Sequence, residues 1–122
     1  MITIILPWPP RELHPNARVH WSKRAKAAKA ARAAGGWATK AAGVRKGDPD
    51  IPQAVKAAIT FYPPDNRRRD VDGMLSNVKS YLDGIADVIG VDDSKWAIEI
   101  TRGSIWNGGE IHITIQEQEA AA

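Results

Sequence analysis

The chain has 122 residues, 43% of them hydrophobic and 25% charged, so it has enough apolar side chains for the core of one ordinary globular domain. It contains no cysteine, which excludes disulfides, thiolate zinc sites and a cysteine nucleophile. No apolar run approaches the roughly 18 residues of a membrane span. Residues 1–6 have no basic region ahead of them and stop at Pro7, so we expect a strand there and not a signal peptide. We therefore expect one soluble, intracellular domain over residues 1–122 with no membrane partner.

The net charge of +3 is divided unevenly between the two parts of the chain. Residues 1–46 hold ten Lys and Arg against one acid, a balance of +9, while the remainder holds seven basic and thirteen acidic residues, a balance of −6. Lys23, Lys26 and Lys29 recur at three-residue spacing and would form a stripe that can follow a phosphate backbone. This division indicates a polyanionic partner beside an acidic site. The alternative is a solvated basic helix surface that keeps the protein soluble.

The basic part is predicted to form a strand followed by a long helix. Residues 2–6 are β-branched and end at proline, and Pro7-Trp8-Pro9-Pro10 then forms a rigid loop because proline lacks the N–H that a ladder needs. From Asn16, the predicted N-cap, to Ala42 the chain is rich in Ala, Lys and Arg, which favours a helix. Gly35-Gly36 is expected to break or kink that helix.

The acidic part is predicted to add three strands and a second helix. After a loop at residues 43–52, apolar and polar residues alternate over 54–62, the period of a strand with one buried face. Residues 74–88 switch to helical spacing, and residues 96–101 alternate again. Asn107-Gly108-Gly109 predicts a hairpin turn before a last strand at residues 111–115. We expect an α+β domain in the order β-α-β-α-β-β, with two main helices on a small mixed or antiparallel sheet of about four strands.

The stretch Arg67-Arg68-Arg69-Asp70-Val71-Asp72 sets three guanidiniums against two carboxylates one residue apart. The carboxylates of Asp70 and Asp72 repel each other unless a cation lies between them, and Mg²⁺ takes oxygen ligands from one or two carboxylates, water and phosphate. A planar guanidinium binds phosphate oxygens through two parallel hydrogen bonds. The stretch therefore predicts metal-assisted phosphodiester chemistry.

The second helix is predicted to carry Asp72, Lys79 and Asp83 on one face, because Lys79 and Asp83 each lie within about 20° of Asp72 at 100° per residue. Helical side chains lean toward the N-terminus, so Lys79 can reach toward a phosphate held near Asp72. The alternative is an ordinary exposed pair between Lys79 and Asp83 at i, i+4.

A second acidic pair, Asp92-Asp93, follows this helix. If Asp70, Asp72 and Asp93 converge, they form an oxygen-rich site for one or two divalent ions, an arrangement that clamps the attacking and leaving oxygens of a phosphodiester. The alternative is that Asp92-Asp93 only forms a turn or a helix cap.

Histidines and aromatic residues have simpler interpretations. His14, His20 and His112 show no repeated ligand spacing, so we expect no histidine metal site. Trp8 is expected to cap the core, with stacking on an unpaired base as the alternative. Val71 and Met74 are assigned to packing. The other tryptophans are expected to anchor the core or an interface: Trp21, Trp37, Trp96 and Trp106.

Several segments, taken together and in order, resemble the RusA family of Holliday junction resolvases. They are Leu6-Pro7-Trp8-Pro9-Pro10, the arginine–aspartate stretch, the lysine-bearing helix ending in Leu82-Asp83-Gly84, and Asp92-Asp93 ahead of a strand. Glu12-Leu13-His14-Pro15-Asn16-Ala17-Arg18 resembles the phage-type branch. The resemblance implies a homodimeric, Mg²⁺-dependent endodeoxyribonuclease, with Mn²⁺ as a possible substitute. It would bind branched DNA, nick four-way junctions symmetrically in recombination and repair, and act in the cytoplasm of a bacterium or phage-infected host.

The resemblance also implies roles for individual residues. The family's metal-binding aspartates fall on Asp70, Asp72 and Asp93, with Asp92 beside the last, and Lys79 matches its catalytic lysine. The sequence departs from the family at Gly73, where an asparagine is usual, and places its lysine seven residues after Asp72 where many members have four. The basic residues expected to bind DNA are Arg18, Lys23, Arg24, Lys26, Lys29, Arg67, Arg68 and Arg69.

Two other functions are compatible with parts of the sequence. Asp70-Val71-Asp72-Gly73 also matches the start of haloacid-dehalogenase phosphatases, but that motif normally follows an apolar strand near the N-terminus of a longer domain. A non-catalytic DNA-binding module is the stronger alternative, since it would keep the basic helix and lose activity.

Overall fold

The computed structural model describes residues 1–119, and their elements follow the predicted order. They are β1 (Ile2–Pro7), the short 3-10 helix η1 (Arg11–Leu13), α1 (Trp21–Ala41), β2 (Val55–Tyr62), α2 (Val71–Ile89), the short 3-10 helix η2 (Asp93–Lys95), β3 (Ala97–Arg102) and β4 (Glu110–Glu117). The α+β class, with two main helices and four strands, is confirmed.

The four strands form one mixed sheet in the order β1-β4-β2-β3. β4 pairs antiparallel with both β1 and β2, whereas β3 pairs parallel with β2 after the chain has crossed over through α2. The predicted hairpin between the last two strands is therefore wrong, although the Asn107-Gly108-Gly109 turn is present, with positive φ at both glycines. Ile111, Ile113 and Ile115 of β4 are fully buried, which a strand in the middle of the sheet allows. Ile98 of β3, the strand at the sheet edge, is 40% exposed.

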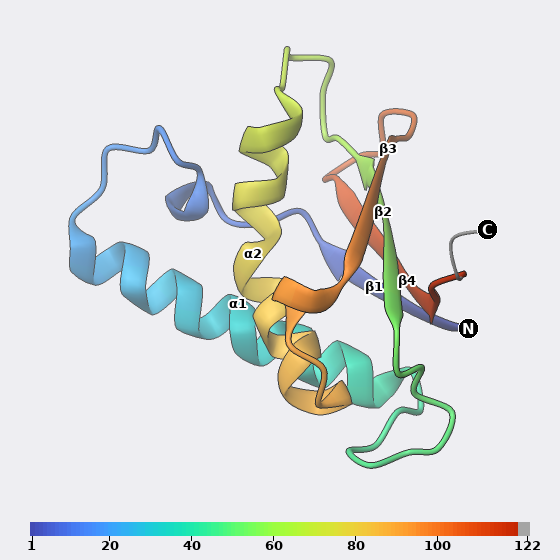
Figure 1. The fold of residues 1–122 in the computed structure, drawn as a ribbon. Helices are drawn as coiled ribbons and strands as arrows, with labels where there is room; N and C mark the ends of the chain where they lie inside the picture. Colours follow the sequence, from blue (N-terminus) through green and yellow to red (C-terminus); the bar gives the residue numbers. More distant parts are fainter. Residues whose placement is uncertain (120–122) are drawn as a thin grey trace.

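Both helices lie on the same side of the sheet (Figure 1). The predicted apolar stripe of α2 faces the core, with Met74, Val78, Leu82 and Ile85 all buried against the inward side chains of the strands. The two helices cross and pack against each other, and α1 also contacts β1. In the described part of the chain, no helix combines the length and apolar character needed to cross a membrane.

Gly35-Gly36 does not break α1, so the expected kink is wrong. The helix is continuous from Trp21 to Ala41, and the glycines instead allow α1 and α2 to approach closely. A Cβ on Gly35 would lie 2.3 Å from the carbonyl oxygen of Tyr81, and one on Gly84 would lie 1.9 Å from that of Arg32. We attribute the intact helix to its hydrogen bonds and to the close packing of the α1 and α2 backbones, which together outweigh the entropic cost of two glycines.

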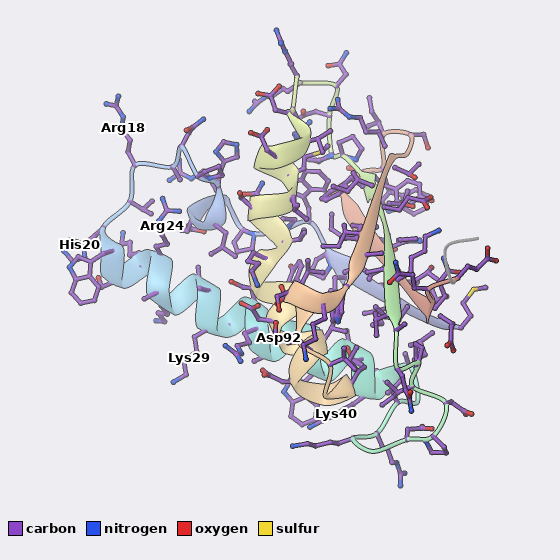
Figure 2. The ribbon with its side chains drawn as sticks, in the orientation of Figure 1. Arg18, His20, Arg24, Lys29, Lys40 and Asp92 are labelled. Carbon is purple, nitrogen blue, oxygen red and sulfur yellow. The ribbon has the colours of Figure 1, made fainter. Side chains whose placement is uncertain are left out.

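The start of α1 also differs from the prediction. Asn16 does not cap the helix, which begins at Trp21 with His20 as its N-cap and the His20 ring accepting from the N–H of Ser22. Residues 14–17 stay outside the helix because the guanidinium of Arg24 donates to the carbonyl oxygens of His14 and Ala17. Arg18 consequently lies on the loop before the helix (Figure 2).

The core contains fewer aromatic side chains than expected. Among the four tryptophans assigned to the core or an interface, only Trp96 is buried, and its indole N–H donates to the carbonyl oxygen of Val91. Trp21, Trp37 and Trp106 are 75%, 70% and 56% exposed, so a core position is wrong for all three. Val71 is 45% exposed, so its assignment to packing is wrong as well, whereas Met74 is buried as predicted.

Candidate functional site

An open cleft of about 770 Å³ lies at the N-terminal end of α2. One wall comes from the arginine–aspartate stretch and the first turns of α2, and the other from the chain that follows β1. The N-terminus of a helix presents free N–H groups and partial positive charge, which favours anions. The residues used below are Trp8, His14, Arg67, Arg68, Arg69, Asp70, Asp72 and Asn77, all of which line this cleft.

Asp70 and Asp72 are exposed in this cleft with their carboxylates largely free. Asp70 occupies the N-cap position of α2, yet its side chain makes no capping hydrogen bond. Asp72 accepts only from the N–H of Gly73, at 3.1 Å. Within residues 1–119 neither carboxylate forms an ion pair. The two oxygens that each aspartate offers are therefore available to a cation or a donor from a ligand.

The three arginines differ in how much of their hydrogen bonding the fold uses. Arg69 is held in place: its guanidinium donates to Asp65 Oδ1 at 2.9 Å and lies 5.2 Å from the ring centre of Trp8. Arg67 is 84% exposed, with only a 3.8 Å contact to Asp65. Arg68 is exposed and forms no ion pair within residues 1–119. Two guanidiniums therefore remain free for phosphate at the edge of the cleft.

Asp65 and Trp8 hold the side chain of Arg69 in its position at the cleft. The backbone N–H of Arg67 and the guanidinium of Arg69 hold the pKa of Asp65 below its usual range, against the opposing effect of burial. Trp8 packs edge-on against Phe61, at 6.1 Å between ring centres, which confirms that it caps the core. It also lines the cleft, so one residue connects the core to the site.

Sequence reasoning missed Asn77. This residue of α2 is 92% buried and lines the cleft, and its Oδ1, itself shielded from solvent, accepts no hydrogen bond from the described residues. A buried carbonyl oxygen without a donor costs free energy, so such an atom points to a missing partner. The signal that was available is its position seven residues after Asp70, on the same side of the helix.

Sequence reasoning also gave His14 no role in the site. Its Nδ1 accepts from the N–H of Asn16, which assigns the proton of the neutral ring to Nε2. A Cβ on Gly73 would lie 4.0 Å from that Nε2, so the ring stands against the first turn of α2. His20 and His112 have partners elsewhere, Ser22 and Glu110, and the three histidines do not gather into one site.

Lys79, Asp83 and Asp93 form a separate charged cluster. Lys79 Nζ lies 2.5 Å from Asp83 Oδ1 and also donates to Asp93 Oδ2, so the i, i+4 pair is confirmed. Burial alone would lower the pKa of Lys79, but hydrogen bonds to the two carboxylates outweigh it and the net shift is upward. Neither Lys79 nor Asp93 lines the cleft. Asp92 caps η2 through the N–H of Ser94, which lowers its pKa, so the capping interpretation is confirmed for it.

The oxygen donors of the cleft fit a hard cation such as Mg²⁺ better than a transition metal. The side chains of Asp70, Asp72 and Asn77 all carry oxygen donors, and Mg²⁺ usually takes one or two carboxylates and keeps several waters. Within residues 1–119, however, no group of three or more His, Cys, Asp and Glu side chains is arranged to hold a metal ion. The structure therefore brings Asp70 and Asp72 together but leaves Asp93 with Lys79.

The basic residues of the first half lie mostly on the surface. Lys23, Lys26 and Lys29 are exposed along α1, with Arg18 and Arg24 at its N-terminal end and Lys40 at the other (Figure 2). Arg24 is half-buried and its guanidinium is already used by two carbonyl oxygens. The predicted lysine stripe is therefore available to a polyanion, whereas Arg24 serves the fold.

Comparison with known proteins finds a relative that is similar over most of the chain. No protein-family model matches the chain. An uncharacterized protein of Xylella fastidiosa strain Temecula1 is 38% identical over 116 residues, which cover 94% of this chain and 76% of that protein. The chain belongs to the same family as this Xylella fastidiosa protein.

Proposed function

We propose that the chain is a Mg²⁺-dependent, structure-selective endodeoxyribonuclease that resolves four-way DNA junctions by symmetrical nicking. The observation that carries the proposal is the cleft itself. It combines two unpaired carboxylates, Asp70 and Asp72, with two free guanidiniums, Arg67 and Arg68, at the positive end of a helix. Few ligands other than a metal-associated phosphodiester require both kinds of charge at one place.

The resemblance to the RusA family supplies the reaction class for this proposal. The family's asparagine is replaced by Gly73, but Asn77 offers an amide to the same cleft one turn further along α2. The lysine stripe of α1 supplies a surface for the DNA backbone, as does the basic balance of residues 1–46.

Each residue of the cleft then has a defined task. Bound Mg²⁺ would supply positive charge that polarises the scissile phosphate. Asp70, Asp72 and the Oδ1 of Asn77 would hold the ion, and Arg67 and Arg68 would orient the phosphate by donating N–H groups. His14 would donate its Nε2 proton to an oxygen bound against the first turn of α2. Outside the cleft, Lys79 neutralises the carboxylate of Asp93.

A homodimer fits the same proposal. A single cleft of this size cuts one strand, so symmetrical cuts in two opposed strands require two copies of the site related by a twofold axis.

Nicking of a labelled four-way junction tests the proposal. Wild type, Asp70→Asn and Asp50→Asn are incubated in Mg²⁺ with the junction and with a linear duplex of the same sequence. Asp50 is an exposed acid on the loop between α1 and β2 and serves as the matched control. We expect paired nicks in the junction only, abolished by Asp70→Asn and unchanged by Asp50→Asn. Equal cutting by Asp70→Asn, or equal cutting of duplex and junction, would contradict it.

A non-catalytic DNA-binding module is the second candidate. The pairing of Asp93 with Lys79 favours it, because among residues 1–119 the cleft then has Asp70 and Asp72 as its carboxylates without an ion pair, while Asp65 is paired with Arg69. It predicts tight junction binding without cutting by any variant, in Mg²⁺ or Mn²⁺.

A further inference from the structure

A second groove, of about 490 Å³, lies between the C-terminal halves of α1 and α2. Its floor is the close helix crossing at Gly36 and Gly84, and its rim carries Trp37 and several charged side chains. No residue of this groove lines the cleft at the N-terminus of α2. We call it the Trp37 groove, defined by Lys29, Arg32, Trp37, Lys40, Lys46 and Asp87.

Trp37 is 70% exposed, although tryptophan is the side chain with the largest apolar surface to bury. Its ring carries the ammonium of Lys40 at 5.0 Å from the centroid, so the indole is already part of a cationic surface. The exposed indole on the wall of the groove offers an aromatic face on which a flat ring can stack.

The charges of the groove select the kind of molecule. Arg32 is neutralised by Asp87 through two hydrogen bonds of 2.7 Å, and this pair lowers the pKa of Asp87, with a further contribution from nearby Lys46. Lys29, Lys40 and Lys46 form no ion pair within residues 1–119. Three ammonium groups therefore line the same groove as one exposed indole, an arrangement that suits a ligand with both phosphates and a flat ring.

A second copy of this chain fits the groove less well. A twofold contact would place the same patch on both subunits, so the lysines of one groove would face those of the other. An acidic peptide would satisfy the lysines but not the exposed ring. Nucleic acid satisfies both, because bases stack on aromatic side chains while the backbone follows positive charge.

The Trp37 groove lies further along α2 than the cleft. Asp83 and Asp93 raise the pKa of Arg32 by their charge, after the larger effect of Asp87, so the groove adjoins the cluster around Lys79. From Asp72 to the groove residues Gly84 and Val88 is twelve to sixteen helical residues, about 18–24 Å along α2. This is the length of about five to seven base pairs at 3.4 Å per step.

We propose that the Trp37 groove binds an unpaired stretch of DNA, with a base stacked on Trp37 and flanking phosphates at Lys29, Lys40 and Lys46. The proposal deepens the proposed function, since it takes its ligand from a branched DNA substrate. It gives the protein a second DNA contact that recognises unstacked bases at a distance from the cleft.

The test measures binding of a twelve-nucleotide oligothymidylate to the full chain carrying Asp70→Asn, by anisotropy of a label on the DNA. Trp37→Ala should weaken binding by about 5- to 100-fold, the effect of losing one base–aromatic stack. Trp37→Phe should recover most of it. Trp21→Ala is the matched control, because Trp21 is similarly exposed on the same helix but outside the groove, and it should change binding less than twofold. Thermal unfolding of each variant verifies that it is folded.

Salt and competitor experiments distinguish DNA from the two alternative ligands of the groove, an acidic peptide and a second copy of the chain. Lys40→Gln combined with Lys46→Gln should reduce the slope of log affinity against log salt by about 0.7 per lysine. Three results would overturn the proposal: equal binding by Trp37→Ala and Trp21→Ala, equal capture of an acidic peptide through Trp37, or a change in sedimenting mass on Trp37→Ala without loss of DNA binding. The assay contains no cutting step. Trp37-dependent DNA binding by a protein that never cuts would therefore refute the proposed function alone.

Discussion

Replacing Gly84 with alanine should destabilise the protein, because Gly84 lies where α1 and α2 cross in backbone contact. The new Cβ would lie 1.9 Å from the carbonyl oxygen of Arg32 and 2.8 Å from the backbone nitrogen of Gly36. Both are main-chain atoms, so no side-chain rotation relieves the clash. Ordinary contact begins at 3.4 Å, so the helices must separate locally by roughly 1.5 Å.

The magnitude follows from two opposing effects. Overpacking at a tight contact costs about 1–3 kcal/mol, and a clash with backbone on both sides lies at or above the upper end. Alanine recovers about 1 kcal/mol of helix propensity relative to glycine. The net loss in free energy of unfolding should be about 2 kcal/mol, which lowers the Tm of a domain of this size by roughly 6–10 °C.

Gly73→Ala in the same helix is the matched control. A Cβ there meets only the Nε2 of His14, at 4.0 Å, so the substitution should leave stability unchanged or raise it by up to about 1 kcal/mol. Urea unfolding followed by circular dichroism measures both variants. If Gly84→Ala were as stable as Gly73→Ala, the close crossing of α1 and α2 would be refuted.

Four further predictions concern the site. Asn77→Leu should raise stability by about 1 kcal/mol in urea unfolding, since it removes an unpaired buried carbonyl, while weakening Mn²⁺ binding in calorimetry. His14→Gln should slow junction cutting more than it weakens junction binding, and equal losses would contradict its role as a donor. The lowered pKa of Asp65 means that its stabilising effect is complete above its ordinary value of 3.8 and is lost as pH falls below it. The difference in Tm between wild type and Asp65→Asn should therefore vanish in acid. Junction affinity should fall steeply with salt, and a flat response would exclude the lysine stripe of α1 as a DNA surface.

Periodicity was sufficient to predict the elements and the buried face of α2. The alternation of residues 54–62 and the stripe from Met74 to Ile85 each follow one repeat over many residues, so one misplaced side chain does not obscure them. The order of strands was beyond this reasoning. Whether β4 pairs with β3 or inserts between β1 and β2 depends on which strand can bury its isoleucines, which is a property of the whole sheet.

The glycines and tryptophans show a different limit. Two adjacent glycines are typical of a helix break. Here they form a contact surface instead, because the backbone of α2 packs directly against them. Trp37 is a residue type that usually lies in a core, yet it is exposed on the wall of the groove beside the helix crossing. Residue type predicts the usual environment of a side chain. At these positions the actual environment is set by the helix that packs against them.

Within the candidate site, residues close in sequence were easier to place than residues brought together by the fold. Asp70 and Asp72 share the cleft with Arg67 and Arg68 because all four lie within six residues of one another in the sequence. The distance between Asp93 and this group depends on the path of η2 and on Lys79, neither of which a spacing rule describes.

Cutting of a supercoiled plasmid that carries an extruded cruciform tests the central claim most directly. The first nick releases the supercoiling and lets the cruciform reabsorb, so linear product forms only when the opposed strand is cut within the lifetime of the same complex. We predict that wild type in Mg²⁺ yields linear plasmid and that Asp70→Asn yields none. Nicked circles alone, or linear product from Asp70→Asn, would contradict a paired, metal-dependent cut at the Asp70–Asp72 cleft.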